Sequence, residues 1–142
     1  MPGDLMFNVM NSIHRGILKL SGGRLGWQAS NMPVLELTTI GRKSGEPRSV
    51  MLTAPLIEGG NIVIVASRGG DDQNPAWFLN LRDHPAVEVA MKGASRTPMI
   101  ASIANAQDRA RMWPLITEKH TNYSGYQKKT DREIPLVVLS PA

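Results

Sequence analysis

The sequence predicts one mainly β domain of the α+β class, a small and partly open β-barrel with an N-terminal helix and peripheral helices. Three observations predict it. The 142 residues provide room for a single domain, 1–142, with one core. Short runs rich in β-branched residues are separated by glycine and proline, as in antiparallel sheets. No strand–helix–strand unit repeats along the chain, which disfavours a Rossmann or P-loop architecture.

Residues 1–22 are predicted to form an amphipathic helix, because apolar residues recur between Leu5 and Leu20 at three- to four-residue spacing. Gly22 and Gly23 end it. Packing on its own domain is the favoured interpretation, and resting on a membrane surface is the alternative. No apolar run is long enough for a membrane span and no secretory signal is evident. We therefore expect a cytoplasmic protein, with the inner face of the membrane as a further place of contact.

The strands and helices that follow are predicted from their patterns. Glycine at 59 and 60 favours a hairpin turn, and Pro55 is expected to place an edge or a bend at the end of the second strand. The expected strands are 34–39, 49–57, 62–66, 86–91, 99–104 and 134–139. A short helix should begin at Pro75, and a longer one, capped by Asn105 and kinked at Pro114, should reach about His120.

Composition narrows the function. The chain has no cysteine, which excludes disulfides, thiolate catalysis, iron–sulfur clusters and cysteine-based zinc sites. Its three histidines share no metal-ligand spacing, so we expect no metal site. A net charge of +4 is compatible with cofactor phosphates as well as with nucleic acid. The basic loops are not interleaved with aromatic residues as in nucleic-acid modules, so no nucleic-acid partner is expected.

The segment from Thr38 to Arg48 is the first that could bind a ligand. Within eight residues it carries three cations, two glycines and a serine: Arg42, Lys43, Ser44 and Arg48 are the polar members of interest. Such a loop offers backbone N–H groups and cationic side chains to a phosphate or carboxylate. A solvated basic hairpin explains the same composition equally well.

The segment 67–77 is the second that could bind a ligand. Ser67 and Arg68 at a strand end, followed by two glycines, form a plausible rim for a bound cofactor. Trp77 could form one wall of a pocket for a flat ligand, although composition alone favours a place in the core. Trp113, on the apolar side of its helix, is expected in the core.

The third segment holds the two tyrosines of the chain, Tyr123 and Tyr126, which share one face if the segment is helical. They could line a substrate pocket or donate a proton, and an aromatic patch that attaches this segment to the barrel is equally compatible. Asp131 and Arg132 are interpreted as structural charges. No catalytic triad, carboxylate pair or histidine cluster is recognisable, which suggests that a bound cofactor carries the chemistry.

Five blocks, in order and spacing, resemble the deazaflavin-dependent nitroreductase family. They are Leu37 to Arg48, Val65 to Gly70, Asn74 to Leu81, Tyr123 to Gln127 and Thr130 to Pro135. The resemblance implies a split β-barrel of the flavin-reductase type that binds coenzyme F420, a deazaflavin with a phosphorylated, polyglutamylated tail. It also implies hydride transfer from the reduced coenzyme to a quinone or a nitroaromatic compound.

The resemblance also implies roles for residues. The anionic tail and its phosphate would be held by Arg42, Lys43, Arg48 and Arg68, with Ser44 counted among the coenzyme-binding residues. The deazaflavin and acceptor pocket would be lined by Ser67, Asn74, Pro75 and Trp77. The catalytic candidates are Tyr126, Tyr123 and Ser67, with Tyr126 or water supplying the proton.

Two alternatives stay open at this point. An FMN- or FAD-dependent reductase could use the same fold, and a non-enzymatic protein could bind the deazaflavin without turning it over. Whether the chain is a monomer or a homodimer is equally open.

Overall fold

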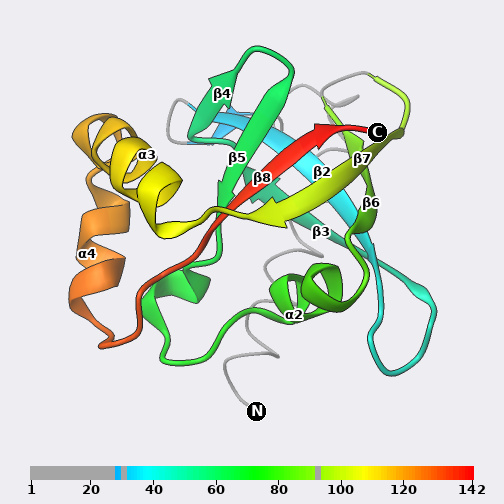
Figure 1. Cartoon of the computed structure of the whole chain (residues 1–142), viewed down its shortest axis with the longest axis horizontal. Coiled ribbons are helices and arrows are strands. Elements are labelled where there is room, and N and C mark those ends of the chain that lie inside the picture. The colour runs from blue at the N-terminus through cyan, green and yellow to red at the C-terminus, as the bar shows by residue number, and fades with distance from the viewer. Residues whose placement is uncertain (1–27, 30–31, 92–93) are drawn as a thin grey trace.

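The computed structural model describes residues 28–29, 32–91 and 94–142 (Figure 1). The predicted N-terminal helix, 1–22, lies outside the described residues. The strands of the described chain are β1 (Gln28–Ala29), β2 (Met32–Ile40), β3 (Pro47–Thr53), β4 (Leu56–Glu58), β5 (Asn61–Val65), β6 (Ala86–Ala90), β7 (Thr97–Ile103) and β8 (Leu136–Pro141).

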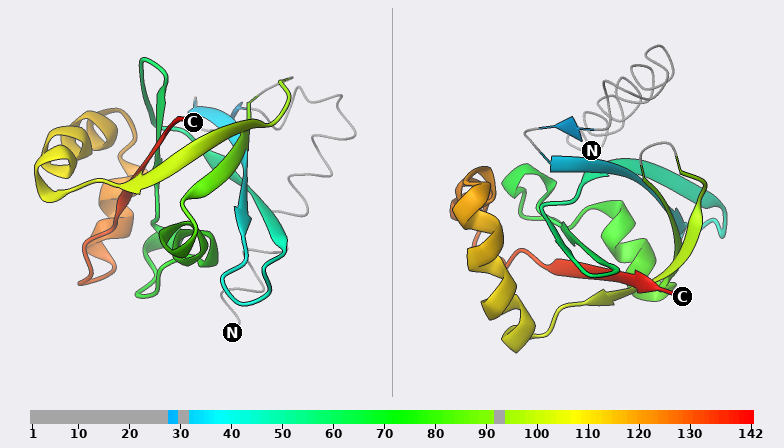
Figure 2. Two further views of the ribbon diagram at one scale, coloured as in Figure 1. Left: turned by 45° about the vertical axis from the view of Figure 1, so that its right-hand side comes forward. Right: turned by 90° about the horizontal axis from the view of Figure 1, so that it is seen from above.

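All of these strands pair in antiparallel fashion in one curled sheet. The path runs β2–β6–β7–β8–β5–β4, with β1 and β3 both paired to β2. The sheet thus begins at β3 and finishes at β4, which follow each other directly in the chain. Ala54 and Pro55 separate them, at the point where Pro55 was predicted to place a bend. Seen from above, the sheet curls into a ring (Figure 2), which confirms the predicted partly open barrel.

The helices lie in two places. α2 (Ala76–Asp83) crosses one end of the barrel, whereas α3 (Ala106–Lys119) and α4 (Asn122–Lys128) lie on its outer side (Figures 1 and 2). Asn105 caps α3 as predicted, because its side chain accepts a hydrogen bond from the Asp108 backbone N–H at 2.8 Å. Pro114 lies inside α3, which continues for another turn to Lys119.

Two clusters of buried side chains result. The inner cluster fills the barrel and includes Trp77, Phe78 and Leu81 of α2. The outer cluster joins the barrel to α3 and α4. In β5, Ile62 and Ile64 enter the inner cluster while residues 63 and 65 enter the outer one. A strand buried on both faces needs a continuous apolar run, which is why this segment had the strongest β pattern.

Three predictions differ in detail. The single strand expected at 49–57 is divided into β3 and β4, because the chain turns at Ala54 and Pro55. β8 begins at Leu136, not at Ile134, because the Ile134 N–H is bound by the Gln127 side chain at 2.9 Å before strand pairing starts. Trp113 was expected in the core, but it is only half-buried beside the outer cluster. A charged group, the Arg109 guanidinium, lies over its ring at 4.4 Å from the centroid, where a core residue would have an apolar neighbour.

Candidate functional site

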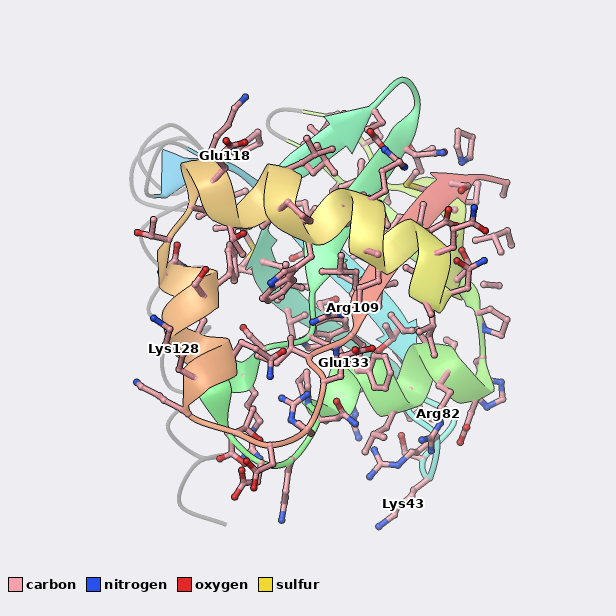
Figure 3. All side chains as sticks on the ribbon, turned by 60° about the vertical axis from the view of Figure 1, so that its left-hand side comes forward. Lys43, Arg82, Arg109, Glu118, Lys128 and Glu133 are labelled. Atoms are coloured by element: carbon pink, nitrogen blue, oxygen red, sulfur yellow. The ribbon has the colours of Figure 1, made fainter. Side chains whose placement is uncertain are left out.

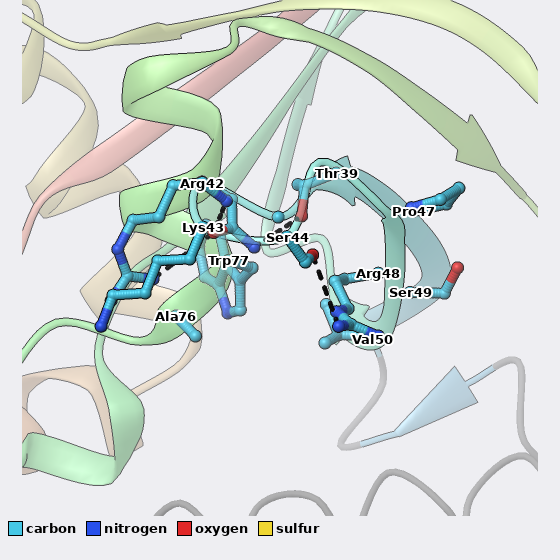
Figure 4. Close-up of a pocket in the computed structure, with 12 residues that line it drawn as sticks. Thr39, Arg42, Lys43, Ser44, Pro47, Arg48, Ser49, Val50, Ala76 and Trp77 are labelled. Carbon is cyan, nitrogen blue, oxygen red and sulfur yellow. Dashed lines mark hydrogen bonds between the residues drawn. The ribbon is translucent and has the colours of Figure 1, made fainter.

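A cavity of about 600 Å³ opens where the β2–β3 hairpin meets α2 (Figure 4). It therefore lies at the barrel end that α2 crosses. Its lining combines cationic, hydroxyl and apolar side chains from both elements: Thr39, Gly41, Arg42, Lys43, Ser44, Pro47, Arg48, Ser49, Val50, Ala76, Trp77 and Asn80. The cavity thus brings together five of the residues that the sequence suggested: Arg42, Lys43, Ser44, Arg48 and Trp77.

The hairpin loop is held in shape by its own backbone. The Gly41 N–H donates to the Glu46 carbonyl, and the Gly45 N–H donates to the Gly41 carbonyl, both at 2.8 Å. Gly45 has φ +72°, a conformation that glycine adopts without cost. A Cβ on Gly41 would lie 2.5 Å from the Ser44 hydroxyl, which would have to rotate away, and 3.4 Å from the Glu46 carbonyl oxygen. The result is a defined loop that presents its side chains from fixed positions.

Three cations stand at the mouth of the cavity. Arg48 is paired with Thr39 in the β2–β3 register, and Val50 with Leu37 of the inner cluster. Strand alternation therefore aims Arg48 along the same face as the core, just beyond its edge. Arg42, Lys43 and Arg48 are all exposed, and within the described residues none of them forms an ion pair. Lys43 extends away from the ribbon (Figure 3). Unpaired cations beside a cavity favour an anionic ligand.

Trp77 satisfies both interpretations of the sequence. It belongs to the inner cluster, with only 8% of its surface exposed, and it also lines the cavity beside Val50 and Ala76. Phe78 packs edge-on against it, with the ring centroids 6.5 Å apart. These contacts fix the indole, so the cavity has one rigid apolar wall that suits a flat ring system.

Asn80 is a site residue that the sequence reasoning missed. It is 4% exposed, and its Oδ1 accepts hydrogen bonds from the Arg42 backbone N–H at 3.1 Å and from the Arg42 guanidinium at 3.4 Å. Its Nδ2 donates to the Thr39 hydroxyl at 3.2 Å. Asn80 thus fastens the hairpin loop to α2. The sequence did contain a signal for this role: Asn80 is a polar residue three positions after Trp77, on the apolar face of a predicted helix.

Six predicted site residues lie outside the cavity lining, and four of them belong to one loop. Ser67, Arg68, Asn74 and Pro75 belong to the loop that leads from β5 into α2, so they adjoin Ala76 of the cavity wall. Arg68 is buried in the 3-10 helix η1 (Arg68–Gly70), where its guanidinium lies 3.5 Å from the Asp71 carboxylate. Arg68 is therefore part of the structure of its loop, unlike the three exposed cations at the cavity mouth.

Arg132 accounts for the shape of that loop, and its predicted structural role is confirmed. Its guanidinium hydrogen-bonds to the loop at four oxygens, at distances from 2.8 to 3.2 Å. Burial lowers the pKa of Arg132, and the nearby Asp71 and Asp72 oppose this effect. The group stays charged, because an arginine starts from a pKa far above neutral pH.

The two tyrosines share a helix, as the spacing allowed. Both lie on α4, with ring centroids 5.9 Å apart in an edge-to-face contact. The Tyr123 hydroxyl is buried and hydrogen-bonded with the Thr53 hydroxyl at 2.8 Å, whereas Tyr126 is half-buried. Burial raises the pKa of the Tyr123 phenol, and the bond with Thr53 partly offsets it. Neither tyrosine lines the cavity.

An antiparallel barrel with a cationic, apolar-walled cavity at one end is typical of small β-barrel proteins that bind a flat, anionic cofactor. The sequence pattern of the F420H(2)-dependent quinone reductase family matches residues 11–141, and the chain belongs to this family. The expected deazaflavin-dependent class is thereby confirmed.

Related proteins agree with this assignment. An F420H(2)-dependent quinone reductase of Mycobacterium tuberculosis is 37% identical over 132 residues, covering 90% of this chain and 87% of the relative. A structure of F420-H2 Dependent Reductase (FDR-A) is 37% identical, with a TM-score of 0.67, and the match covers 76% of this chain and 94% of that one. A structure described as a domain-swapped dimer is 32% identical with a TM-score of 0.69, covering 94% and 98% of the two chains.

No helix in the described part of the chain is long and apolar enough to cross a bilayer.

Proposed function

We propose that this protein transfers a hydride from reduced coenzyme F420 to a quinone, with the coenzyme held at the β2–β3 cavity. The observation that carries the proposal is a set of three exposed cations, Arg42, Lys43 and Arg48, at the mouth of a cavity with a fixed apolar wall. None of the three forms an ion pair in the part of the chain that the structure describes. Family membership supports the same donor and acceptor.

The residues present fit this coenzyme. Its tail carries several negative charges, and charge-assisted hydrogen bonds from arginine and lysine are the strong way to hold such groups. Its ring system is flat and apolar, which suits the wall formed by Val50, Ala76 and Trp77. When bound, the reduced coenzyme supplies the hydride.

The remaining tasks belong to the chain itself. The hairpin cations bind and orient, and Asn80 holds the Arg42 backbone in place so that little rearrangement accompanies binding. Trp77 keeps water from the deep side of the cavity, since it is almost fully buried. The acceptor also needs a proton, for which we propose Tyr126 or a water molecule. Tyr126 contacts the 66–74 loop through its backbone, since a side chain on Gly70 would lie 2.7 Å from the Tyr126 carbonyl oxygen.

The test is a titration of tryptophan fluorescence with F420, run beside FMN, FAD and NADPH. We expect saturable quenching by F420 alone, because Trp77 lines the cavity. Arg42→Ala and Arg48→Ala should each raise the Kd about tenfold, the loss of one charge-assisted contact, with unchanged thermal stability. The exposed Arg82→Ala, outside the cavity lining, is the matched control. Tight binding of FMN or FAD instead would support the flavin alternative, and no response to any ligand would contradict the proposal.

We further propose that residues 1–22 bring the enzyme to the membrane, where apolar quinones reside. The support is their amphipathic pattern. The full chain should sediment with liposomes, and a chain that begins at Gly23 should not. Equal behaviour of the two chains would contradict this role. A homodimer stays a prediction, supported by a relative described as a domain-swapped dimer.

A further inference from the structure

The side chain of Arg132 joins the two ends of the 66–74 loop. Its NH2 nitrogen donates to the Ala66 carbonyl at 3.2 Å and to the Ser67 carbonyl at 3.0 Å, where β5 ends. Its Nε donates to the Asp71 carbonyl at 2.8 Å, and NH1 donates to Asn74 Oδ1 at 2.9 Å, just before α2. One guanidinium therefore fixes the separation between the end of β5 and the start of α2.

The loop needs such support. Arg68, Gly69 and Gly70 have φ of +47°, +65° and +87° in succession, and Arg68 is the one non-glycine residue with positive φ in the described chain. A residue with a side chain persists in this conformation only where its surroundings enforce it. Besides Arg132, the loop is held by the Thr130 hydroxyl, which donates to the Asp72 carboxylate at 2.7 Å.

Arg132 also sets the orientation of the Asn74 amide. A guanidinium donates hydrogen bonds and cannot accept them, so the carbonyl oxygen of Asn74 must face it. The Nδ2 group of Asn74 is then turned away from Arg132 and can donate to a ligand oxygen. Asn74 stands two residues before Ala76 of the cavity wall, so this donor is placed next to the proposed coenzyme site.

We propose that Arg132 is a positioning residue for coenzyme binding: it holds the 66–74 loop and the Asn74 amide in the arrangement that receives the deazaflavin. The inference rests on the proposed function. Lysine could not replace arginine here, because one ammonium group cannot reach four oxygens that lie on both sides of a planar fork.

The experiment compares Arg132→Lys and Arg132→Ala with Arg109→Ala as a matched control. Arg109 is also largely buried, and it donates to the Ile134 carbonyl at 3.0 Å and to the Gln127 side chain at 3.2 Å. Among the described residues, no hydrogen bond or ion pair joins its side chain to the 66–74 loop. Arg109 belongs to the first turn of α3, and its side chain lies close to Glu133 (Figure 3). Two quantities are measured for each variant: the Kd for F420 from fluorescence, and amide hydrogen exchange across residues 67–74. Arg132→Ala is also titrated with F420 in low-millimolar guanidinium chloride, against an equal concentration of sodium chloride.

Both Arg132 variants should raise the Kd about tenfold and speed exchange at 67–74, whereas Arg109→Ala should change neither. Guanidinium should restore F420 binding to Arg132→Ala, an effect that general destabilisation cannot produce because guanidinium itself weakens folding. Wild-type Kd and exchange in a folded Arg132 variant would overturn the proposal. If Arg132→Ala does not fold, Arg132→Lys carries the same two readouts. If the wild-type chain does not bind F420, the proposed function fails, and exchange at 67–74 alone decides whether Arg132 positions the loop.

Discussion

Two arginine-containing loops lie at the same end of this barrel and use their cations in opposite ways. In the 41–46 hairpin loop and the strand after it, Arg42 and Arg48 are exposed and form no ion pair within the described residues. In the 66–74 loop, Arg68 is buried against Asp71, and Arg132 is bonded to four loop oxygens. The first pair is available to a ligand and the second pair maintains the structure.

The difference follows from what surrounds each charge. A buried guanidinium must have its hydrogen bonds satisfied, so Arg68 and Arg132 are engaged by the protein itself. An exposed guanidinium without an anionic partner loses little by staying hydrated and can exchange water for a phosphate. The presence of an arginine in a glycine-rich loop therefore does not by itself indicate a ligand site.

Arg111 gives an intermediate case. It is exposed yet paired through both terminal nitrogens with the Glu58 carboxylate, at 2.8 and 2.9 Å. This hydrogen bonding lowers the pKa of Glu58. Exposed pairs of this kind contribute little to stability, so the contact marks where α3 meets β4 without holding it there alone.

The largest expected effect comes from breaking the structural loop at Gly70. Its φ is +87°, and an added side chain would lie 2.7 Å from the Tyr126 carbonyl oxygen. Gly70→Ala should therefore lower the free energy of unfolding by about 2–4 kcal/mol, from the strained backbone together with the overlap against α4. Urea unfolding measures it.

Gly59→Ala is the matched control for this substitution. Gly59 also has positive φ, +61°, but nothing lies within 4 Å of an added side chain. Only the backbone cost should appear there, about 1–2 kcal/mol. Equal losses in the two variants would show that the contact between η1 and α4 adds nothing to the free energy of unfolding. The view that the 66–74 loop is held by its packing on α4 would then be wrong.

Much of the secondary structure, and one of the two loops, could be predicted from patterns of neighbouring residues. The strand at 62–66, the bend at Pro55 and the cap at Asn105 each depend on neighbours in sequence, and the structure has all three. The basic hairpin could be singled out for the same reason, since its glycines and cations lie within eight residues.

The contacts of Arg132 and Asn80 could not be predicted, because each depends on partners far away in the chain. Arg132 meets Ala66 and Ser67 across more than sixty positions, and Asn80 meets Arg42 across thirty-eight. Arg68 is buried even though its ion-pair partner Asp71 lies only three residues away, and its burial cannot be predicted from that spacing. Sequence spacing could therefore identify both loops as candidates but could not show which of their arginines are engaged by the protein itself.

The smallest expected effect on stability concerns the 41–46 hairpin loop, the second of the two loops compared. Asn80 is the one buried polar anchor of this loop on α2 among the described residues, and it serves both Arg42 and Thr39. Asn80→Ala should lower the free energy of unfolding by about 1–3 kcal/mol, because the Arg42 N–H and the Thr39 hydroxyl lose their partner. It should also weaken F420 binding, since Arg42 is then no longer held at the cavity mouth. Arg82→Ala on the same helix, 52% exposed, should change neither quantity measurably. Lost stability with unchanged F420 binding would mean that Asn80 supports the fold alone, and that the cations of this loop find their ligand without being positioned in advance.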